Sequence, residues 1–329
     1  MKALIIPPEA GGRILPFYLA AEEWVAGHLS ADDWFFAWQV SPTVICGRHQ
    51  DMPLEVDLDY AREHGIAVWR RKSGGGCVYA DNHNVMFSYI TSGTGVQGCF
   101  HRYTDHICRM LAAMGITAEP TGRNDVAVSG HKVAGNAFYR SHGRSIVHGT
   151  MLYDADPDTM SRVLTPSRAK LASKGVQSVP ARITTLRARG IAVSCDDFIS
   201  RAMDFLGADG SYILTDTDIA QVEEIMQSYL RPDFLRREGF GAHPACRSIR
   251  FDGVGELRAS LALADDNTIA ELDLSGDFFG SYERKRELTD RLRGVSLSAR
   301  AIAAALDGFP VTEAVEGADA DTIVRLLTT

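Results

Sequence analysis

Three consecutive glycines closely behind three cations constrain this chain more than any other feature. The segment 69–89 reads WRRKSGGGCVYADNHNVMFSY, so a strand-like apolar run follows the glycines. Glycine loses more backbone entropy on folding than any other residue, so three in a row indicate that bare backbone is needed there. Bare backbone lets N–H groups approach an anion, often a phosphate. The segment therefore predicts an anion-binding turn between two strands, with a surface turn as the alternative.

Two known glycine-rich phosphate motifs do not fit this turn. The dinucleotide fingerprint G-x-G-x-x-G opens a helix, whereas these glycines are contiguous and lead into a strand. The P-loop ends in Gly-Lys-Ser/Thr, whereas here the cations come before the glycines. Without a helix dipole, the positive charge must come from side chains, and Arg70, Arg71 and Lys72 are expected to supply it.

A second polar cluster, GRNDVAVSGHKVAGNAFYR, occupies 122–140 and contains Lys132 within an apolar strand-like run. A lysine in such a run is uncommon unless its ammonium has a partner, and the alternative is an edge-strand lysine facing water. We expect Lys132 to be a cation that no neighbouring acid compensates. The segment RSIVHGTMLYDAD then places His148 at the mouth of a strand, either as a ligand or as a structural histidine.

A third stretch, AKLASKGVQSVPARITTL, carries the cations Lys170, Lys174 and Arg182 around Gly175. It is either a mobile cationic lid over a site or, as the favoured alternative, a solvated loop.

The length of the chain predicts two domains, because 329 residues are too many for one typical hydrophobic core. Residues 1–240 and 246–329 are the expected domains, joined by a linker at 231–245 rich in proline, glycine and charge that permits relative motion. Periodicity predicts helices at 15–29, 56–65, 97–115, 156–164, 195–207 and 217–230. Strands are expected at 2–7, 66–71, 77–90 and 144–155, and at 125–140 with a tight turn at Ser129-Gly130. Segment 33–47 is expected to form one or two strands around the Ser41-Pro42 turn. Beyond the linker, a β-meander over 246–278 precedes two or three helices.

Charge and cysteine content exclude several classes of protein. A net charge of −8 argues against a general nucleic-acid binder, which usually carries a basic domain or stripe. No apolar run reaches membrane-spanning length, and the first residues lack the pattern of a signal peptide. Six cysteines without C-x-x-C spacing make a poor disulfide framework and a poor zinc site. We therefore expect a cytoplasmic protein with reduced thiols and with neither a nucleic-acid nor a membrane partner.

Taken in order, the clusters resemble the lipoate–protein ligase A family. RRKSGGGCVYAD is similar to its RRxSGGGxVxxD signature, and GRNDVAVSGHKVAGNA to its GRND…G-x-K-x-x-G-x-A segment. HGTMLYDAD resembles its HGTLL strand, and KLASKGVQSVPARITTL its KLxSKGIxSV loop. FYLAAEEWV and GRHQD fit its opening helix and the strand that follows. The similarity covers essentially the whole chain, and the combination of motifs is specific although no single motif is.

The resemblance implies an α/β (α+β) fold: a mixed-sheet catalytic domain of the biotin/lipoate ligase type with a small C-terminal α+β accessory domain. It implies a two-step reaction in which lipoate and ATP, with Mg²⁺, form lipoyl-AMP and pyrophosphate. The lipoyl group then passes to a lysine of a lipoyl domain. The implied partners are the lipoyl domains of 2-oxoacid dehydrogenase E2 subunits and the glycine-cleavage H protein.

The resemblance also assigns roles to residues. Lys132 is the implied catalytic residue, a compact point charge at the junction of carboxylate and phosphate. The implied ATP contacts are Arg71, Gly76, Cys77, Val78, Tyr79, Asn124, Asp125 and Lys132. The implied lipoate contacts are Lys132, Trp38, Ser73, Gly75, Arg140 and His148, with Phe36 and Val78 as weaker candidates for the apolar slot. Asp125 is the implied Mg²⁺ ligand, because Mg²⁺ prefers one or two carboxylates plus phosphate oxygens.

Two departures from the family pattern and three alternative functions stay open. Ala80 stands where the family usually has histidine, and His83 where it usually has glycine, so the local turn geometry is in doubt. An ATP-independent octanoyl- or lipoyl-transferase needs an activated cysteine, and no cysteine lies between Cys108 and Cys195, where that branch has its nucleophile. A non-catalytic lipoate-binding homologue is a second alternative. A biotin ligase is disfavoured because its GRGRxG-type loop is absent.

Overall fold

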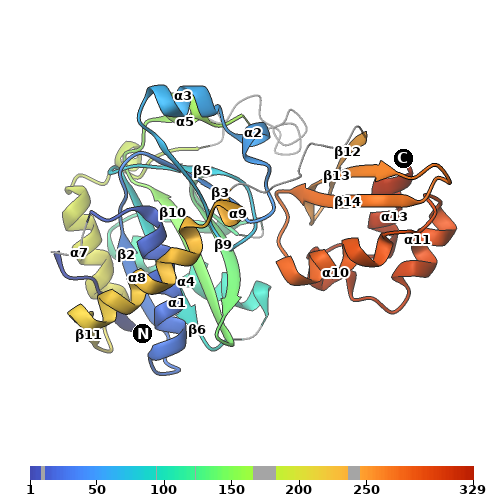
Figure 1. Cartoon of the computed structure of the whole chain (residues 1–329). Coiled ribbons are helices and arrows are strands. Elements are labelled where there is room, and N and C mark those ends of the chain that lie inside the picture. The colour runs from blue at the N-terminus through green and yellow to red at the C-terminus, as the bar shows by residue number, and fades with distance from the viewer. Residues whose placement is uncertain (9–11, 94, 123, 166–182, 236–244) are drawn as a thin grey trace.

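An eight-stranded sheet forms the centre of the N-terminal part of the molecule (Figure 1). The computed structural model describes residues 1–8, 12–93, 95–122, 124–165, 183–235 and 245–329. The strands of this sheet are β1 (Lys2–Ile5), β2 (Trp34–Trp38), β6 (Asn84–Thr91), β7 (Glu119–Thr121), β8 (Asp125–Val128), β9 (His131–Ser141), β10 (Arg144–Leu152) and β11 (Ser211–Ile213). Their order is β11-β1-β2-β6-β10-β9-β8-β7. Because β1 is parallel to both its neighbours and the other pairs are antiparallel, the predicted mixed sheet is confirmed.

Helices cover both faces of this sheet, which explains the aromatic run of β2. They are α1 (Leu15–His28) and α8 (Asp216–Leu230) on one face, and α4 (Val96–Ala113) and α7 (Cys195–Leu206) on the other. Side chains alternate along a strand. One side of β2 accordingly packs against α1 and α8 through Trp34, Phe36 and Trp38. The other side packs against α4 and α7 through Phe35. With both faces buried, β2 is apolar throughout instead of alternating with polar residues.

A smaller three-stranded sheet carries the glycine turn. Its strands β3 (Thr43–Cys46), β4 (Ala67–Arg70) and β5 (Val78–Ala80) have the order β4-β3-β5, and α2 (Met52–Glu55), α3 (Leu58–Glu63) and α5 (Pro157–Val163) lie near it. The prediction of one strand over 77–90 is wrong, because β5 and β6 belong to different sheets. Asp81 turns the chain between them: its carboxylate accepts from His83 N at 2.8 Å, and its carbonyl from Asn84 N at 3.0 Å. His83 therefore fits this turn despite replacing a glycine.

The C-terminal part has its own antiparallel sheet and core. Strands β12 (Ala245–Phe251), β13 (Gly255–Leu263) and β14 (Ile269–Gly276) form the expected meander. The helices α10 (Tyr282–Leu292), α11 (Ala299–Leu306), α12 (Val311–Ala314) and α13 (Ala320–Thr328) pack on it. Two or three helices were expected; the one-turn α12 is too short to show a periodic pattern. The sequence also missed the three-residue strands β7 and β11, the 3₁₀ turn η2 (Arg187–Arg189), and α9 (Pro232–Leu235) within the expected linker.

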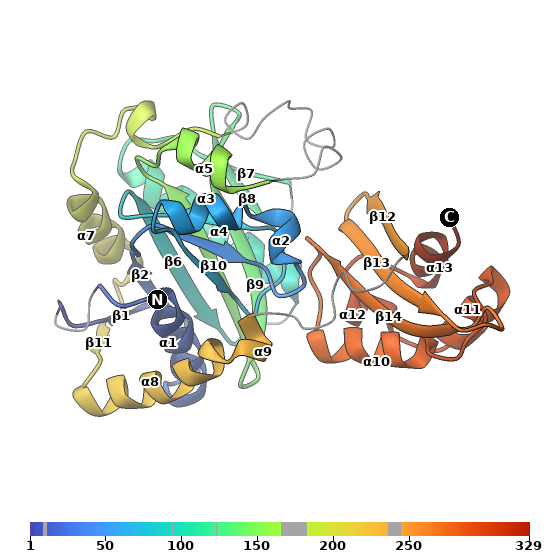
Figure 2. The ribbon, with the colours of Figure 1, turned by 45° about the horizontal axis from the view of Figure 1, so that its top comes forward.

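The C-terminal sheet lies on the side of the N-terminal part that carries α2, as Figures 1 and 2 show. Gly75 N donates to Phe278 O at 3.1 Å, and Gly276 N donates to His49 O at 3.0 Å. Arg258 Nη1 also contacts Glu55 Oε1 at 2.8 Å, and both side chains are at most 8% exposed. Two backbone hydrogen bonds and a buried ion pair therefore join the two parts of the chain, at the glycine turn, at His49 and at α2.

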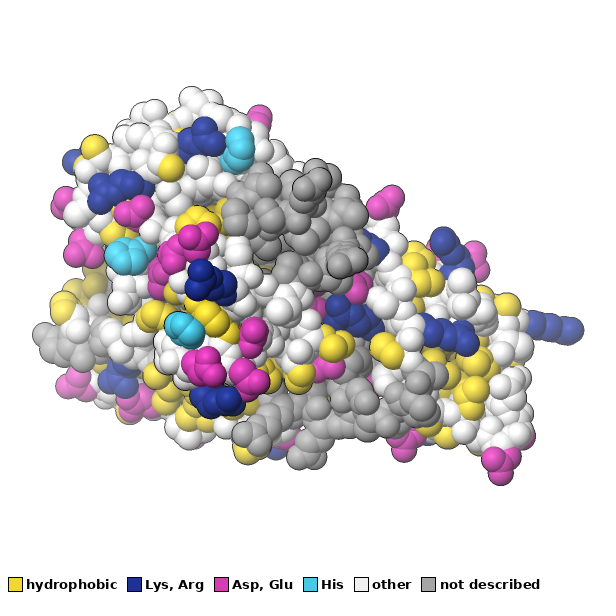
Figure 3. Space-filling model, turned by 90° about the horizontal axis from the view of Figure 1, so that it is seen from above, with side chains coloured by type: hydrophobic (Ala, Val, Ile, Leu, Met, Phe, Trp, Pro, Cys, Tyr) yellow, Lys and Arg dark blue, Asp and Glu magenta, His cyan; other side chains and the backbone are white. Residues whose placement is uncertain are grey.

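Figure 3 shows acidic and basic side chains interspersed over one face of the molecule. Within the described residues, no helix combines the length and the hydropathy needed to cross a membrane.

Candidate active site

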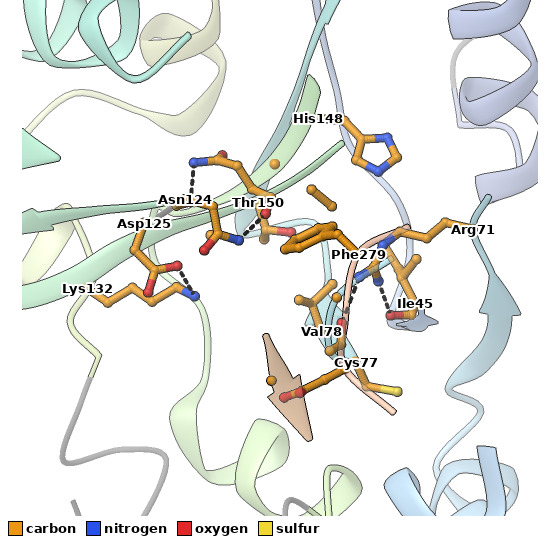
Figure 4. Close-up of a pocket in the computed structure, with 18 of the residues that line it drawn as sticks. Ile45, Arg71, Cys77, Val78, Asn124, Asp125, Lys132, His148, Thr150 and Phe279 are labelled. Atoms are coloured by element: carbon orange, nitrogen blue, oxygen red, sulfur yellow. Dashed lines mark hydrogen bonds and ion pairs between the residues drawn. The ribbon is translucent and has the colours of Figure 1, made fainter. Parts of the chain in front are cut away.

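A cavity of about 480 Å³ lies where the glycine turn, the strands β8–β10 and the C-terminal sheet meet. Figure 4 shows side chains from all three regions pointing into it. The predicted site residues that line it are Trp38, Arg71, Gly75, Gly76, Cys77, Val78, Tyr79, Asn124, Asp125, Lys132 and His148. Segments separated by more than two hundred residues along the chain thus form one pocket.

Lys132 is paired with Asp125 inside this cavity. Lys132 Nζ lies 2.8 Å from Asp125 Oδ1, and the two side chains are only 23% and 11% exposed (Figure 4). The expectation of an uncompensated cation is therefore wrong. The carboxylate comes from the neighbouring strand β8, and that strand pairing was not visible along the sequence. The pair fixes the ammonium at one point of the cavity wall, where it can meet an incoming anion.

Gly135 provides the space for that ammonium, and this gives a first prediction. A Cβ on Gly135 would lie 2.3 Å from Lys132 Nζ and 2.7 Å from its Cε. Lysine is flexible, so Gly135→Ala should displace the side chain at little cost in stability. We expect the rate of the reaction in this cavity to fall roughly tenfold or more, since misplacing a catalytic group by about 1 Å can cost up to roughly a hundredfold. Steady-state kinetics and a thermal melt of the same sample check this; an unchanged rate would contradict it.

Arg71 braces the glycine turn from within. Its guanidinium donates to the carbonyls of Ile45, Gly74 and Gly76 at 2.6 to 2.8 Å and to Ser73 Oγ at 2.9 Å. Burial lowers the pKa of the guanidinium, an effect that nearby thiols oppose. The surface-turn alternative is thus wrong, because this cation is buried.

The two cations beside Arg71 also bond to protein groups. Arg70 donates to the carbonyls of Gly47 and Gln50, and Lys72 Nζ lies 2.7 Å from Glu23 Oε1. The expectation that all three cations supply charge to a bound anion stays a prediction. Their donors shape the turn, and the Lys and Arg side chains that line the cavity within the described residues are Arg71, Lys132 and Arg250.

The glycines are needed because backbone segments approach the turn from two sides. A Cβ on Gly74 would lie 2.4 Å from Phe278 O, and a Cβ on Gly47 would lie 2.0 Å from Gly75 O. Gly75 also has a φ of +86°, which favours glycine. The glycines therefore allow neighbouring backbone segments to pack closely against the turn, and they would equally allow an anion to approach its N–H groups.

Glu22 is a buried acidic residue in contact with His148, and the sequence analysis missed it. Its carboxylate, fully buried within α1, accepts from His148 Nδ1 at 2.9 Å, from Tyr139 OH at 3.1 Å and from the hydroxyl of Ser88. A glutamate inside the apolar run FYLAAEEWV was the available signal, of the same kind as Lys132 in its strand. Buried carboxylates are stable only when such donors satisfy them.

This network connects the predicted lipoate wall to the glycine turn. Trp38 Nε1 donates to Ser88 Oγ at 2.9 Å, and the indole stacks on Tyr18 with centroids 4.9 Å apart. Ser73 Oγ lies 2.7 Å from His148 Nε2. Because Arg71 donates to the Ser73 oxygen, the serine hydrogen is directed to the histidine. Ser73 itself is fully buried, so it orients His148 from beneath the cavity wall.

Three other predicted parts of the site do not belong to the cavity wall that the structure describes. Arg140 lies exposed at the end of β9 and is not part of the cavity wall that the described residues form, so the structure gives its lipoate role no support. Phe36 is buried in the core with α1 and likewise does not line the described wall. Lys170, Lys174, Gly175 and Arg182 of the predicted lid lie outside the described residues.

Asn124 and Asp125 are the residues to consider as ligands of a metal ion in the cavity. Asn124 Nδ2 donates to Asn136 O, and Asn136 N donates back to Asn124 O at 3.0 Å, which holds Asp125 in place. No group of three or more potential ligands from His, Cys, Asp and Glu occurs in the described part of the chain. A cation here would need phosphate oxygens to complete its shell, which is how Mg²⁺ is usually held.

Cys108 and Cys195, which do not line the described cavity, are poor nucleophiles. Burial raises the pKa of both Cys108 and Cys195 to about 11, so each is a neutral thiol near pH 7. Only Cys77 among the cysteines lines the described cavity.

Comparison with known proteins gives the same assignment over both parts of the chain. A model of the lipoyl protein ligase A/B catalytic domain matches residues 16–207, and one of the bacterial lipoate protein ligase C-terminus matches residues 245–327. Lipoate-protein ligase LplJ of Bacillus subtilis is 30% identical over 305 residues, which cover 88% of this chain and 89% of that protein. A lipoate–protein ligase of Streptococcus pyogenes is 31% identical over 323 residues, 93% and 94% of the two chains.

Solved structures show the same fold. The structure of Plasmodium falciparum LipL1 in complex with lipoate superposes with a TM-score of 0.78 at 18% identity, covering 99% of both chains. That of a lipoate-protein ligase A bound with ATP has a TM-score of 0.59 at 21% identity, covering 71% of this chain and 97% of that one.

Proposed function

The chain belongs to the lipoate–protein ligase family, and from this premise we propose how its residues activate lipoate with ATP and transfer it to protein. Lipoate and ATP are joined to lipoyl-AMP with release of pyrophosphate, and the lipoyl group then passes to a lysine of a lipoyl domain. The observation that carries the assignment of roles is Lys132, held by Asp125 in a cavity that residues from both predicted ligand sets line.

Lys132 stabilises the negative charge that develops in both steps of the reaction. Attack of a carboxylate on the α-phosphate of ATP brings two anions together, and negative charge accumulates on the phosphate oxygens. A fixed ammonium stabilises that charge without rearranging, because Asp125 already holds it in position. In the second step, the same ammonium stabilises the oxygen of the acyl carbonyl while the acceptor lysine attacks.

The lipoate tail occupies the apolar side of the cavity. That side is lined by Leu19, Trp38, Val78 and Met86. His148, which is hydrogen-bonded to Glu22, also lines the cavity. An aliphatic chain gains about 0.8 kcal/mol for each methylene removed from water, so a slot of this kind supplies much of the binding. Ser73 supports His148, and Gly75 borders the slot.

ATP lies along the residues after the glycines. The cavity wall beside Arg71 is formed by Gly76, Cys77, Val78 and Tyr79. Mg²⁺ would be held by the Asp125 carboxylate, with Asn124 beside it, and would supply charge neutralisation at the phosphates. We assign residues 1–240 to catalysis and 246–329 to the accessory domain, and the E2 subunits and the H protein as acceptors.

Mass spectrometry of a lipoyl domain tests this function. A lipoyl domain incubated with the chain, lipoate and MgATP should gain a single lipoyl group, and should gain none when ATP is omitted. A matched reaction offers an octanoyl or lipoyl acyl-carrier thioester without ATP. Equal modification in that reaction would instead place the chain among the transferases, and no modification under any condition would favour the non-catalytic homologue.

Cys77→Ala separates the ligase from the thioester mechanism. If no acyl-enzyme forms, this variant changes only packing and one contact beside the nucleotide, and we expect it to keep substantial activity. The measurement is ligation rate together with a search for acyl-enzyme by intact mass. Complete loss of activity in the variant, with an acyl group trapped on the unmodified chain, would overturn the ligase mechanism.

A further inference from the structure

Two thiols, those of Cys46 and Cys77, lie in contact at the wall of the cavity. Their Sγ atoms are 2.9 Å apart. Cys46 is buried at the end of β3, whereas Cys77 is partly exposed, precedes β5 by one residue and lines the cavity. The two are 31 residues apart in the chain, so only the fold brings them together.

The backbone already has the spacing of a disulfide. Antiparallel β3 and β5 place Val44 opposite Tyr79 and Ile45 opposite Val78. Extending this register by one residue places Cys46 opposite Cys77. Directly opposed residues in antiparallel strands have Cα atoms about 4.5–5.5 Å apart, within the roughly 4.4–6.8 Å that disulfides span.

One thiol of this pair is accessible to a small solute. The buried Arg71 guanidinium lies near both thiols. Cys77 opens to the cavity, so a small solute can reach it, whereas Cys46 stands behind it in the position of a resolving thiol.

We propose that Cys46 and Cys77 form an oxidisable dithiol, which hydrogen peroxide converts to a disulfide that slows the reaction in this cavity. The Cys77 thiolate attacks a peroxide oxygen, the O–O bond breaks, and Cys77 sulfenic acid and hydroxide form. The Cys46 sulfur then attacks the Cys77 sulfur, the S–O bond breaks, and hydroxide leaves. The two thiol protons neutralise the two hydroxides, so two thiols lose two electrons and the peroxide becomes two waters.

The disulfide acts through the glycine turn. Bond formation brings the sulfurs from 2.9 Å to about 2.05 Å, which draws Cys77 toward β3 and away from the cavity. Gly75 and Gly76 directly precede it, and Arg71 and Phe278 already hold their backbone groups. The two side chains share this movement, and a shift of a fraction of an ångström passed on to the turn should lower the ligation rate roughly tenfold, because a full 1 Å misplacement can cost about a hundredfold. This consequence rests on the proposed function, whereas formation of the bond does not.

The test treats the purified full chain with hydrogen peroxide. Remaining thiols are blocked by alkylation, and mass spectrometry with fragmentation searches for peptides linked through Cys46 and Cys77. We expect the linked pair, short of two hydrogens, together with a roughly tenfold slower ligation that dithiothreitol restores. Cys46→Ala should give no linked pair, and Cys108→Ala, which alters a thiol on α4, should respond as the unmodified chain does.

Each outcome decides one part of the proposal. If peroxide drives Cys77 to sulfinic acid with no linked pair, the dithiol assignment is overturned. If the linked pair forms while ligation keeps its rate, the inhibitory role is overturned. If untreated protein lacks ligation altogether, the proposed function has failed, and the linked-peptide measurement still decides whether the dithiol forms.

Discussion

Lys132→Ala is expected to lose both half-reactions while keeping its fold. The ammonium is the cation that Asp125 positions in the cavity, and it is not replaced by Arg70, Arg71 or Lys72, whose donors point to protein groups. Removing one preorganised electrostatic group from an active site typically costs roughly 100- to 1,000-fold in rate. We expect a loss of that size in pyrophosphate release from lipoate and ATP, and in transfer from supplied lipoyl-AMP.

Two matched variants sharpen this experiment. Lys132→Arg keeps the charge but replaces a compact ammonium with a planar fork, so it should recover only part of the rate. Asp125→Asn keeps the lysine and removes its anionic partner, and should lower the rate less than Lys132→Ala does. Thermal melts of all three confirm the fold. Near-normal rates of both half-reactions in folded Lys132→Ala would remove this residue from the mechanism.

Glu22→Ala is expected to destabilise the chain and weaken lipoate binding together. The substitution leaves the donors of His148, Ser88 and Tyr139 without their shared acceptor in a fully buried place. Losing one partner of a buried charged network costs roughly 3 kcal/mol or more. His148 would lose its orientation, and with it the contacts that reach Ser73 at the glycine turn.

The conservative variant Glu22→Gln separates packing from hydrogen bonding. Glutamine has the same size but only one acceptor oxygen, and its amide would meet donors instead of acceptors. We expect a smaller loss of stability than in Glu22→Ala and a similar loss of lipoate affinity. Urea unfolding and calorimetric titration with lipoate measure the two quantities. A Glu22→Ala chain as stable as the unmodified one would show that the network contributes nothing to folding.

Several elements could be predicted because their information is local. Helix α1 follows from an apolar run with a proline in its first turn, and α4 from its periodic apolar face. The hairpin of β8 and β9 follows from Ser129-Gly130, both of which have positive φ. Strands of three residues, such as β7 and β11, carry too little pattern to predict, and their pairing partners lie far along the chain.

The sequence by itself determined that segment 69–89 is a glycine turn between strands and that its motifs match a lipoate–protein ligase, because residue type and spacing are local properties. Only the tertiary structure decided where the charges go. Arg71 and Lys72 bond to protein groups because β3 and α1 pack against the turn, and Lys132 meets Asp125 because β8 pairs with β9. A hydrogen bond depends on distance and direction in space, and strand register sets both. The same register places Cys46 against Cys77, which no spacing along the chain indicates.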